Sequence, residues 1–295
     1  MSGTYSGWNL DSPVFITAGG VTRIAVTCKS NHRVVLFDAL APARTAFLGR
    51  AGKGPGAFLR PNGIAALEDG GKPLLLVVER DNARLQLHEG APGGGPVALL
   101  THPVFRKPYG IAVQPDGAGA LLHVTDLLPD RQGHRVHSFR LEKRNGYRLH
   151  LVRSFGTARE GLFIPESIVF DPLYNRIILC DETPGKGKLL VYDLTGRLLF
   201  SRGAGRCLHD PEGIAFAPAG CGGYLLAADQ LPRTVIRLFH RKSLKYAGST
   251  VLGKTSHTDG IAVGLEDGRT LLAAVHLDTA VHVYAVRDII RAMRR

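Results

Sequence analysis

An internal repeat constrains the fold of this chain more than any other feature of its sequence. Six short apolar segments, most of them close variants of Gly-Ile-Ala, recur at intervals of 46 to 57 residues across the 295 positions. Each segment opens with a polar side chain, and these side chains are Asp11, Asn62, Tyr109, Glu166, Glu212 and Asp259. A period of this length indicates a solenoid, a propeller or another array in which neighbouring units share a core.

Each repeat contains stretches that have the pattern of short antiparallel strands. A second apolar stretch follows the opening segment, as in LLLVVE at 74–79, and an alternating one follows it, as in KLLVYD at 188–193. A fourth stretch is visible in five repeats, and Gly, Pro and Asp fill the turns. The sequence therefore predicts an all-β fold, a six-bladed β-propeller with four-stranded antiparallel blades, as a single domain over residues 1–295.

The two ends of the chain have separate predictions. The sixth repeat lacks a fourth strand of its own before a basic C-terminal tail at residues 287–295. Residues 4–9 (TYSGWN) precede the first repeat, and we expect them to close the ring as the outer strand of blade six. The alternative is a frayed terminus.

Composition narrows the functional classes. The chain has no apolar run long enough to cross a membrane and no leader-like N-terminus, so we expect no membrane partner. It would be cytoplasmic, or secreted with its leader missing here.

The net charge of +12 points to an anionic partner. Because the cations are scattered along the repeats and aromatics are only 7%, we expect a small anionic molecule rather than nucleic acid, bound by a monomer.

The six opening side chains are candidates for a functional site. First strands line the channel of a propeller, so we expect these residues to form an inner ring at one mouth of the channel. A second set, expected at the same mouth, ends the second strands: Cys28, Glu79, Asp126, Glu182, Asp229 with Gln230, and His276. Asp210 is expected to project beside Glu212.

So many carboxylates in one place need a cation among them, because their mutual repulsion otherwise raises their pKa values. Oxygen donors in this number indicate calcium rather than zinc. The alternative is that these polar residues accept hydrogen bonds from turn amides, or bind channel water.

Several segments resemble the β-propeller phytases, a family of calcium-dependent phosphohydrolases, mainly between Pro108 and Val263. They are PYGIAV at 108–113, ESIVFDPLYNRIILCDE at 166–182, DPEGIAF at 210–216, GGYLLAADQ at 222–230 and YAGSTVLGKTSHTDGIAV at 246–263. The resemblance implies these calcium ligands: Asp11, Tyr109, Glu166, Glu182, Asp210, Glu212, Gln230 and Asp259.

The N-terminal third is similar to the family more loosely. TCKSN at 27–31 and VERDN at 78–82 keep Lys29 and Arg80 where the family binds phosphate, while residues 47–65 look more like an NHL repeat. Several positions depart from the family pattern, among them VHLDT at 275–279, where His276 and Asp278 stand in place of a Gln-Asp pair. Ser12 and His257 stand where Asp is usual, and Leu127 replaces a phosphate-binding Lys for which Arg131 would substitute.

The resemblance implies hydrolysis of a phosphomonoester by water that calcium activates. Lys29, Arg80, Glu182 and Glu212 would be catalytic, and Lys29, Arg80 and Arg131 would bind the substrate. Two other classes stay open. One is a non-catalytic interaction propeller of the NHL type. The other is a different metal-dependent propeller enzyme, such as a lactonase or phosphotriesterase, or a scaffold recruited for other chemistry, with Asn62 and Glu166 as ligands.

Overall fold

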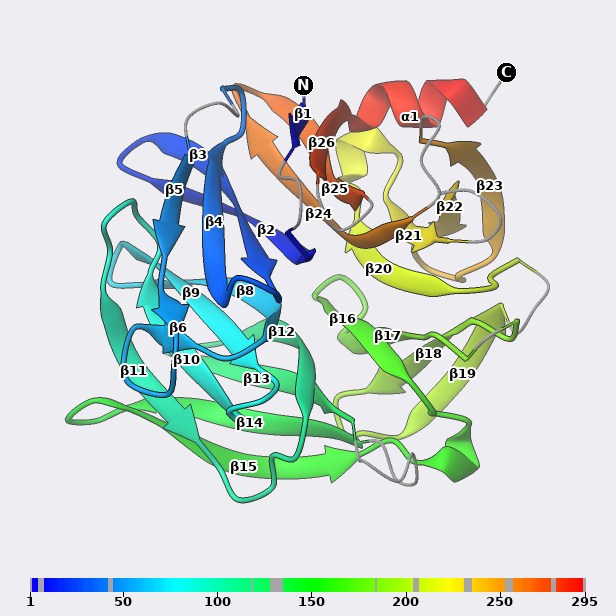
Figure 1. Cartoon of the computed structure of the whole chain (residues 1–295). Helices are drawn as coiled ribbons and strands as arrows, with labels where there is room; N and C mark the ends of the chain where they lie inside the picture. The colour runs from blue at the N-terminus through cyan, green and yellow to red at the C-terminus, as the bar shows by residue number, and fades with distance from the viewer. Residues whose placement is uncertain are drawn as a thin grey trace.

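Six four-stranded antiparallel sheets are arranged around a central axis like the blades of a propeller, as Figure 1 shows. The computed structural model describes residues 2–4, 8–41, 45–117, 119–127, 135–183, 185–203, 207–230, 235–252, 257–276 and 280–293. The predicted all-β, six-bladed propeller is confirmed, and each first strand begins within one residue of its predicted start.

The blades follow one another along the chain, and each runs from the channel outward. Blade one consists of β2 (Leu10–Ala18), β3 (Val21–Cys28), β4 (Arg33–Asp38) and β5 (Thr45–Leu48). Blade two consists of β8 (Pro61–Asp69), β9 (Lys72–Glu79), β10 (Arg84–Glu89) and β11 (Pro96–Thr101). Blade three consists of β12 (Pro108–Asp116), β13 (Gly119–Asp126), β14 (Arg135–Lys143) and β15 (Tyr147–Phe155).

The second half of the ring repeats this order. Blade four consists of β16 (Pro165–Asp171), β17 (Arg176–Asp181), β18 (Lys188–Asp193) and β19 (Leu198–Gly203). Blade five consists of β20 (Pro211–Phe216), β21 (Tyr224–Asp229), β22 (Val235–His240) and β23 (Tyr246–Val251). Blade six consists of β24 (Thr258–Glu266), β25 (Arg269–His276), β26 (Ala280–Ala285) and the N-terminal strand β1 (Ser2–Thr4).

The N-terminus closes the ring, as the sequence predicts. Strand β1 pairs antiparallel with β26, and Ser2 lies opposite His282. The closing strand is shorter and earlier than the predicted segment 4–9, of which residues 5–7 lie outside the described part of the chain. Trp8 packs its ring against Phe47, with 5.5 Å between the ring centroids.

The C-terminal segment is a docked helix rather than a basic tail. Helix α1 (Val286–Met293) buries Val286, Ile289 and Ile290 against blades five and six. These residues and Met293 have the helical spacing i, i+3, i+4 and i+7, which is a signal that the sequence contains. No helix in the described part of the chain has the length and hydrophobicity to cross a membrane.

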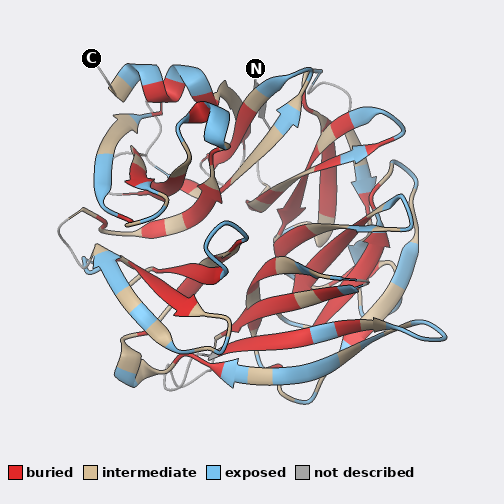
Figure 2. Ribbon diagram, turned by 180° about the vertical axis from the view of Figure 1, so that it is seen from behind, coloured by how far each residue is buried: buried red, intermediate tan, exposed pale blue. Residues whose placement is uncertain are grey.

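Apolar side chains of neighbouring blades interlock to form the core. Figure 2 shows that burial is concentrated in the inner and middle strands, while the outer strands are largely exposed. One cluster joins blades four and five through Ile178, Leu189, Ile214 and Leu225. Because each blade buries one face against the next blade, closure of the ring completes the core.

Every first strand has a β-bulge close to its inner-ring residue. Pairing with the second strand shifts register there in all six blades, and such bulges re-aim a side chain. The residue that follows must be small, since the next first strand is very close. A Cβ at Gly63 would lie 2.3 Å from the carbonyl oxygen of Tyr109, and one at Gly110 would lie 2.4 Å from that of Glu166.

We expect Gly110→Ala to destabilise the protein by about 1–3 kcal/mol, because the added methyl group overlaps the backbone of the next blade. Urea unfolding measures this difference. Gly95→Ala is the matched control, since a Cβ at Gly95 meets nothing within 4 Å. Equal unfolding midpoints for the two variants would contradict the close packing of the first strands.

Candidate metal centre

The inner-ring residues come together at one end of the central channel. A cavity of about 410 Å³ runs along the first strands of all six blades. The inner-ring residues that line it are Asp11, Tyr109, Glu166, Glu212 and Asp259. The sixth, Asn62, is fully buried, and its Nδ2 donates a hydrogen bond of 3.2 Å to Asp11 Oδ2.

The predicted second set has a different place. In four blades the residue that ends the second strand is a buried carboxylate, and we call these residues the capping carboxylates: Glu79, Asp126, Asp181 and Asp229. Each accepts backbone N–H groups from the segment before the first strand of its own blade. The prediction that Glu79, Asp126 and Asp229 line the mouth is therefore wrong. Buried carboxylates need donors, and theirs are turn amides.

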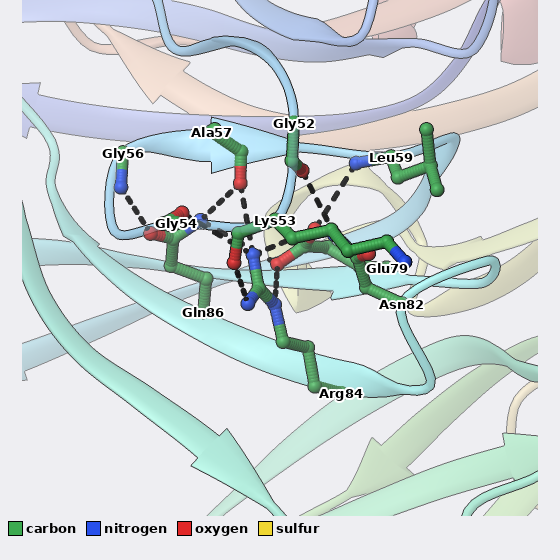
Figure 3. Close-up of polar contacts among 10 residues, drawn as sticks. All are labelled: Gly52, Lys53, Gly54, Gly56, Ala57, Leu59, Glu79, Asn82, Arg84 and Gln86. Carbon is green, nitrogen blue, oxygen red and sulfur yellow. Dashed lines mark hydrogen bonds and ion pairs between the residues drawn. The ribbon is translucent and has the colours of Figure 1, made fainter.

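Glu79 shows what a capping carboxylate does (Figure 3). It accepts the N–H of Leu59 at 3.1 Å and pairs with Arg84, whose Nε lies 2.6 Å from Glu79 Oε1. Arg84 also donates to the carbonyl oxygen of Ala57 at 3.0 Å, and Gln86 Nε2 donates to the same oxygen at 3.2 Å. This buried network fixes the loop between blades one and two, which lies beside the mouth.

The other two blades have no carboxylate at this position. Cys28 is buried in blade one. In blade six, His276 Nδ1 lies 3.0 Å from the hydroxyl of Thr258, and the hydroxyl of Tyr284 lies 3.2 Å from its Nε2. Burial lowers the pKa of His276 to about 4, so the ring is neutral at pH 7 and part of the interior.

In five blades, the residue that directly follows the end of the second strand lies at the mouth. We call these positions the outer ring, and they are Lys29, Arg80, Leu127, Glu182 and Gln230. Each donates its backbone N–H to a carbonyl group just before the first strand of its blade. Glu182 thus belongs with Lys29 and Arg80 rather than with the capping carboxylates. Residue 277 and the predicted substrate ligand Arg131 lie outside the described residues.

The sequence contains a signal for this offset. Residues that end the second strand follow the inner-ring residue by 17 positions in five blades, whereas Glu182 follows Glu166 by 16. Side chains alternate along a strand, so an odd change of spacing moves a residue to the other face. Asp181, which pairs with Pro165 in the register of β16 and β17, keeps the face.

Three carboxylates of blades four and five form a compact cluster. Glu166, Glu182 and Glu212 each place an oxygen atom within 4.8 Å of the others. Asp210 extends this cluster through a hydrogen bond with Glu182, and the Tyr109 hydroxyl donates to Glu166. Within the described residues, the ion pairs include none of these four carboxylates.

The pKa values of the cluster show its electrostatic strain. Burial, followed by the negative charge of Glu182, raises the pKa of Glu166 well above its usual value. Burial and the charges of Glu166 and Glu182 do the same for the pKa of Glu212. Burial also raises the pKa values of Glu182 and Asp210. The metal-free cluster therefore holds protons more tightly than ordinary carboxylates do, and a bound cation would displace them.

Two cationic side chains lie on the opposite side of the mouth, in blades one and two. Lys29 Nζ is 2.6 Å from Asp11 Oδ2. The guanidinium group of Arg80 lies over the ring of Tyr109, 5.7 Å from its centroid, which is within the range of a cation–π contact. The mouth is thus polarised, with carboxylates in blades four and five and cations in blades one and two.

The donor set fits a hard cation. Three buried oxygens at the mouth have no hydrogen-bond partner among the described atoms: Asn62 Oδ1, Asp210 Oδ1 and Asp259 Oδ2. Leaving such atoms unpaired costs free energy unless a cation or water meets them. The clustered donors are oxygens, and oxygen ligands favour calcium over zinc. Gln230 is almost fully buried, next to the backbone of Asp210, while His257 is exposed.

Comparisons with known proteins show the fold alone. No protein-family model and no curated protein matches the chain. A chain in the structure of Kuenenia stuttgartiensis hydrazine synthase aligns at 14% identity and a TM-score of 0.63, over 97% of this chain and 80% of its own length. A chain in the complex of BBS1N with ARL6DN aligns at 15% identity and a TM-score of 0.58, over 97% and 78%. A chain in the nidogen/laminin complex aligns at 16% identity and a TM-score of 0.54, over 92% of each chain.

These solved structures place the chain among the β-propellers. At such identities the likeness extends to the architecture and to no activity or ligand. The function of this chain is therefore inferred from the residues of the mouth.

The raised pKa values predict how stability depends on pH. A group whose pKa is raised in the folded state stabilises the fold at low pH, and this contribution is lost as the pH rises through that pKa. We therefore expect the metal-free protein to lose stability as the pH rises above the ordinary range of carboxyl pKa values, about 4 to 4.5, by about 1.4 kcal/mol per unit of pKa shift. Excess calcium should offset this loss by binding the folded state.

Thermal unfolding at a series of pH values, with and without calcium, measures this loss of stability. Glu212→Gln removes one charge from the cluster and should flatten the metal-free curve. A wild-type curve that is already flat without calcium would contradict the clustering of charge.

We expect substitutions of Glu79 and Glu182 to have opposite effects on stability and calcium binding, because Glu79 caps a loop whereas Glu182 belongs to the acidic cluster. Glu79→Gln leaves Arg84 without its buried counter-charge, so we expect a loss of about 3–5 kcal/mol in stability and an unchanged calcium affinity. Glu182→Gln should leave the metal-free protein at least as stable and weaken calcium binding. Chemical unfolding and calorimetry of both variants test this contrast, and calcium binding that depends on Glu79 would refute it.

Proposed function

We propose that this protein is a calcium-dependent phosphomonoester hydrolase that acts on a small phosphorylated molecule at the channel mouth. The observation that carries the proposal is the opposition of charge there. Glu166, Glu182 and Glu212 cluster on one side, and Lys29 and Arg80 lie on the other. The resemblance of several blade segments to the β-propeller phytases supports the same function.

The carboxylates of blades four and five would hold the calcium. Glu166, Glu182, Asp210 and Glu212 supply charged oxygens, and Tyr109 and Gln230 are the other proposed ligands of this ion. Asp11 and Asp259, which the resemblance also implies as ligands, lie across the mouth in blades one and six. Bound calcium would offset the charge of the phosphate and lower the pKa of the attacking water. The raised pKa values imply that the ion binds more tightly as the pH rises, since it competes with protons.

The side chains of the mouth would perform the remaining tasks. Lys29 and Arg80 bind phosphoryl oxygens, on which charge is spread in the transition state. Arg80 is oriented for this by its contact with Tyr109. Glu182 and Glu212 belong to the acidic cluster, and one of them would accept the proton of the attacking water.

The reaction then balances without a covalent intermediate. The water oxygen forms a bond to phosphorus, and its proton passes to the carboxylate. The bond between phosphorus and the ester oxygen breaks, and the carboxyl group returns the proton to the leaving alcohol. The products are inorganic phosphate and a neutral alcohol.

The departures from the phytase pattern bear on the substrate. Leu127 places an uncharged side chain in the outer ring between Arg80 and Glu182. Ser12 donates its hydroxyl to Asp11 Oδ1 at 2.7 Å, so it supports a carboxylate instead of adding one. Fewer charged groups at the mouth suit a molecule with few phosphates better than a highly phosphorylated one. We therefore favour a simple phosphomonoester over phytate.

The test is phosphate release from an aryl phosphate and from phytate, with calcium and with a chelator. We expect release from the aryl phosphate that requires calcium, and a loss of about 10²-fold or more in Glu212→Gln, in line with the size of a general-base or electrostatic contribution.

Glu68→Gln is the matched control, because it makes the same change of charge on an exposed residue at the far end of β8. It should keep full activity. No release under any condition, by a protein that unfolds normally, would refute the hydrolase.

One observation favours a second candidate. The unpartnered Asn62 Oδ1 and the nearby carboxylates would also suit a single calcium ion that polarises the carbonyl group of a lactone or the phosphoryl group of a triester. Hydrolysis of neutral lactones or triesters, without release from monoesters, would establish this alternative. Absence of all three activities would leave a binding propeller. The aligned chains with this fold come from complexes, BBS1N with ARL6DN and nidogen with laminin.

A further inference from the structure

The side of the mouth formed by blades six, one and two is built around Asp11, which is 4% exposed. Its Oδ1 accepts the hydroxyl of Ser12 at 2.7 Å. Its Oδ2 accepts both the ammonium group of Lys29 at 2.6 Å and the amide of Asn62 at 3.2 Å. Asp11 is therefore a carboxylate whose counter-charge comes from within the chain.

Two oxygens beside this pair have no partner in the described structure. The bond from Asn62 Nδ2 to Asp11 fixes the orientation of the amide, and Asn62 Oδ1 is then buried without a donor. Asn62 is 0% exposed. On the other flank, Asp259 Oδ2 is likewise buried without a partner. Its strand β24 adjoins β2 so closely that a Cβ at Gly260 would lie 2.7 Å from Asp11 O.

Hard oxygen donors gathered around a carboxylate are the ordinary surroundings of a bound cation. Here the positive charge nearest to Asp11 is the ammonium group of Lys29, which reaches in from the outer ring. The equivalent outer-ring position in blade four is Glu182, which adds a negative charge to the cluster of blades four and five. The same backbone position thus supplies a cation to one half of the mouth and a ligand to the other.

We propose that Asp11, Asn62 and Asp259 form a second cation site, and that the Lys29 ammonium group, by pairing with Asp11, supplies the positive charge there and keeps a metal ion out. The wild-type protein therefore binds calcium only at the cluster of blades four and five. Replacing Lys29 by a neutral residue opens the second site to calcium. This inference rests on the metal-binding part of the proposed function and does not depend on its activity.

The tethered ammonium makes the two halves of the mouth chemically different. An ammonium group offers charge and hydrogen bonds, but it cannot coordinate and acidify a water molecule as a metal ion does. Water would therefore be activated on the side of blades four and five alone, while the Lys29 side would orient the anion. A specificity for one direction of attack follows from this asymmetry.

Isothermal titration calorimetry with calcium alone tests the inference. We expect Lys29→Met to bind one calcium ion more than the wild type. Arg80→Met is the matched control, since it removes the cation of the equivalent position in blade two, which contacts Tyr109. It should leave the stoichiometry unchanged. Adding Asp259→Asn should remove the extra ion from Lys29→Met and leave the wild-type stoichiometry as it was.

Equal stoichiometry in the wild type and in folded Lys29→Met would overturn the inference, and so would a wild-type ion that Asp259→Asn removes. If Lys29→Met fails to fold, Lys29→Gln serves in its place, and calcium-dependent thermal stabilisation gives a second readout. An inactive protein would refute the proposed hydrolase while leaving this result intact. A wild type that binds no calcium would contradict the proposed function and would also overturn the inference, which rests on its metal-binding part.

Discussion

The close approach of the six first strands at one end of the channel is the constraint on which the mouth depends. At the bulge of each strand the backbone of the next strand leaves almost no room, as the contacts at Gly63 and Gly110 show. The residues at this position are accordingly small: Ser12, Gly63, Gly110, Ser167, Gly213 and Gly260. The side chain just before each of them belongs to the inner ring. Crowding of the backbone thus places six side chains near one axis, whatever their chemistry.

Carboxylates serve two physical roles in this protein, and a single position along the chain separates them. Asp229 accepts the backbone N–H groups of His209 and Asp210 and pairs with Arg237, so its charge is fully compensated. Its counterpart in blade four is Asp181, and the next residue, Glu182, has neither an arginine nor turn amides around its carboxylate within the described part of the chain. The first kind of carboxylate stabilises the fold. The second kind costs free energy in the metal-free protein, and a bound cation would recover it.

The fold was predictable from the sequence because its signals are local and repeat six times. Turn residues, alternating strands and a constant period all point to the same propeller, and the closing strand follows from the missing strand of blade six. The partners of individual carboxylates were harder to predict. That Glu79 pairs with Arg84 depends on the path of the preceding loop, and that Asp11 pairs with Lys29 depends on a turn between strands. Such pairings are set by tertiary packing, to which a strand pattern gives no direct access.

Two misplacements had signals in the sequence that composition obscured. The apolar residues of α1 have helical spacing, but the arginines around them suggested a solvated tail. The separation of Glu182, which lies at the mouth as expected, from Glu79, Asp126 and Asp229 followed from the parity of its spacing to Glu166, since only an even change keeps a residue on the same face. In both cases periodicity was more informative than the chemical character of single residues, because periodicity reports which face is buried.

The net charge of +12 and the acidic mouth are compatible because their electrostatic effects act over different distances. The field of the whole protein acts over about a Debye length, roughly 8–10 Å at physiological salt, and draws anions toward the surface. The cluster of Glu166, Glu182 and Glu212 acts at contact distance and repels an anion unless a cation is bound first. Under the proposed function, the cation and the phosphorylated substrate therefore bind in a fixed order. Lys29 and Arg80, on the far side of the mouth, then hold the substrate facing the cation.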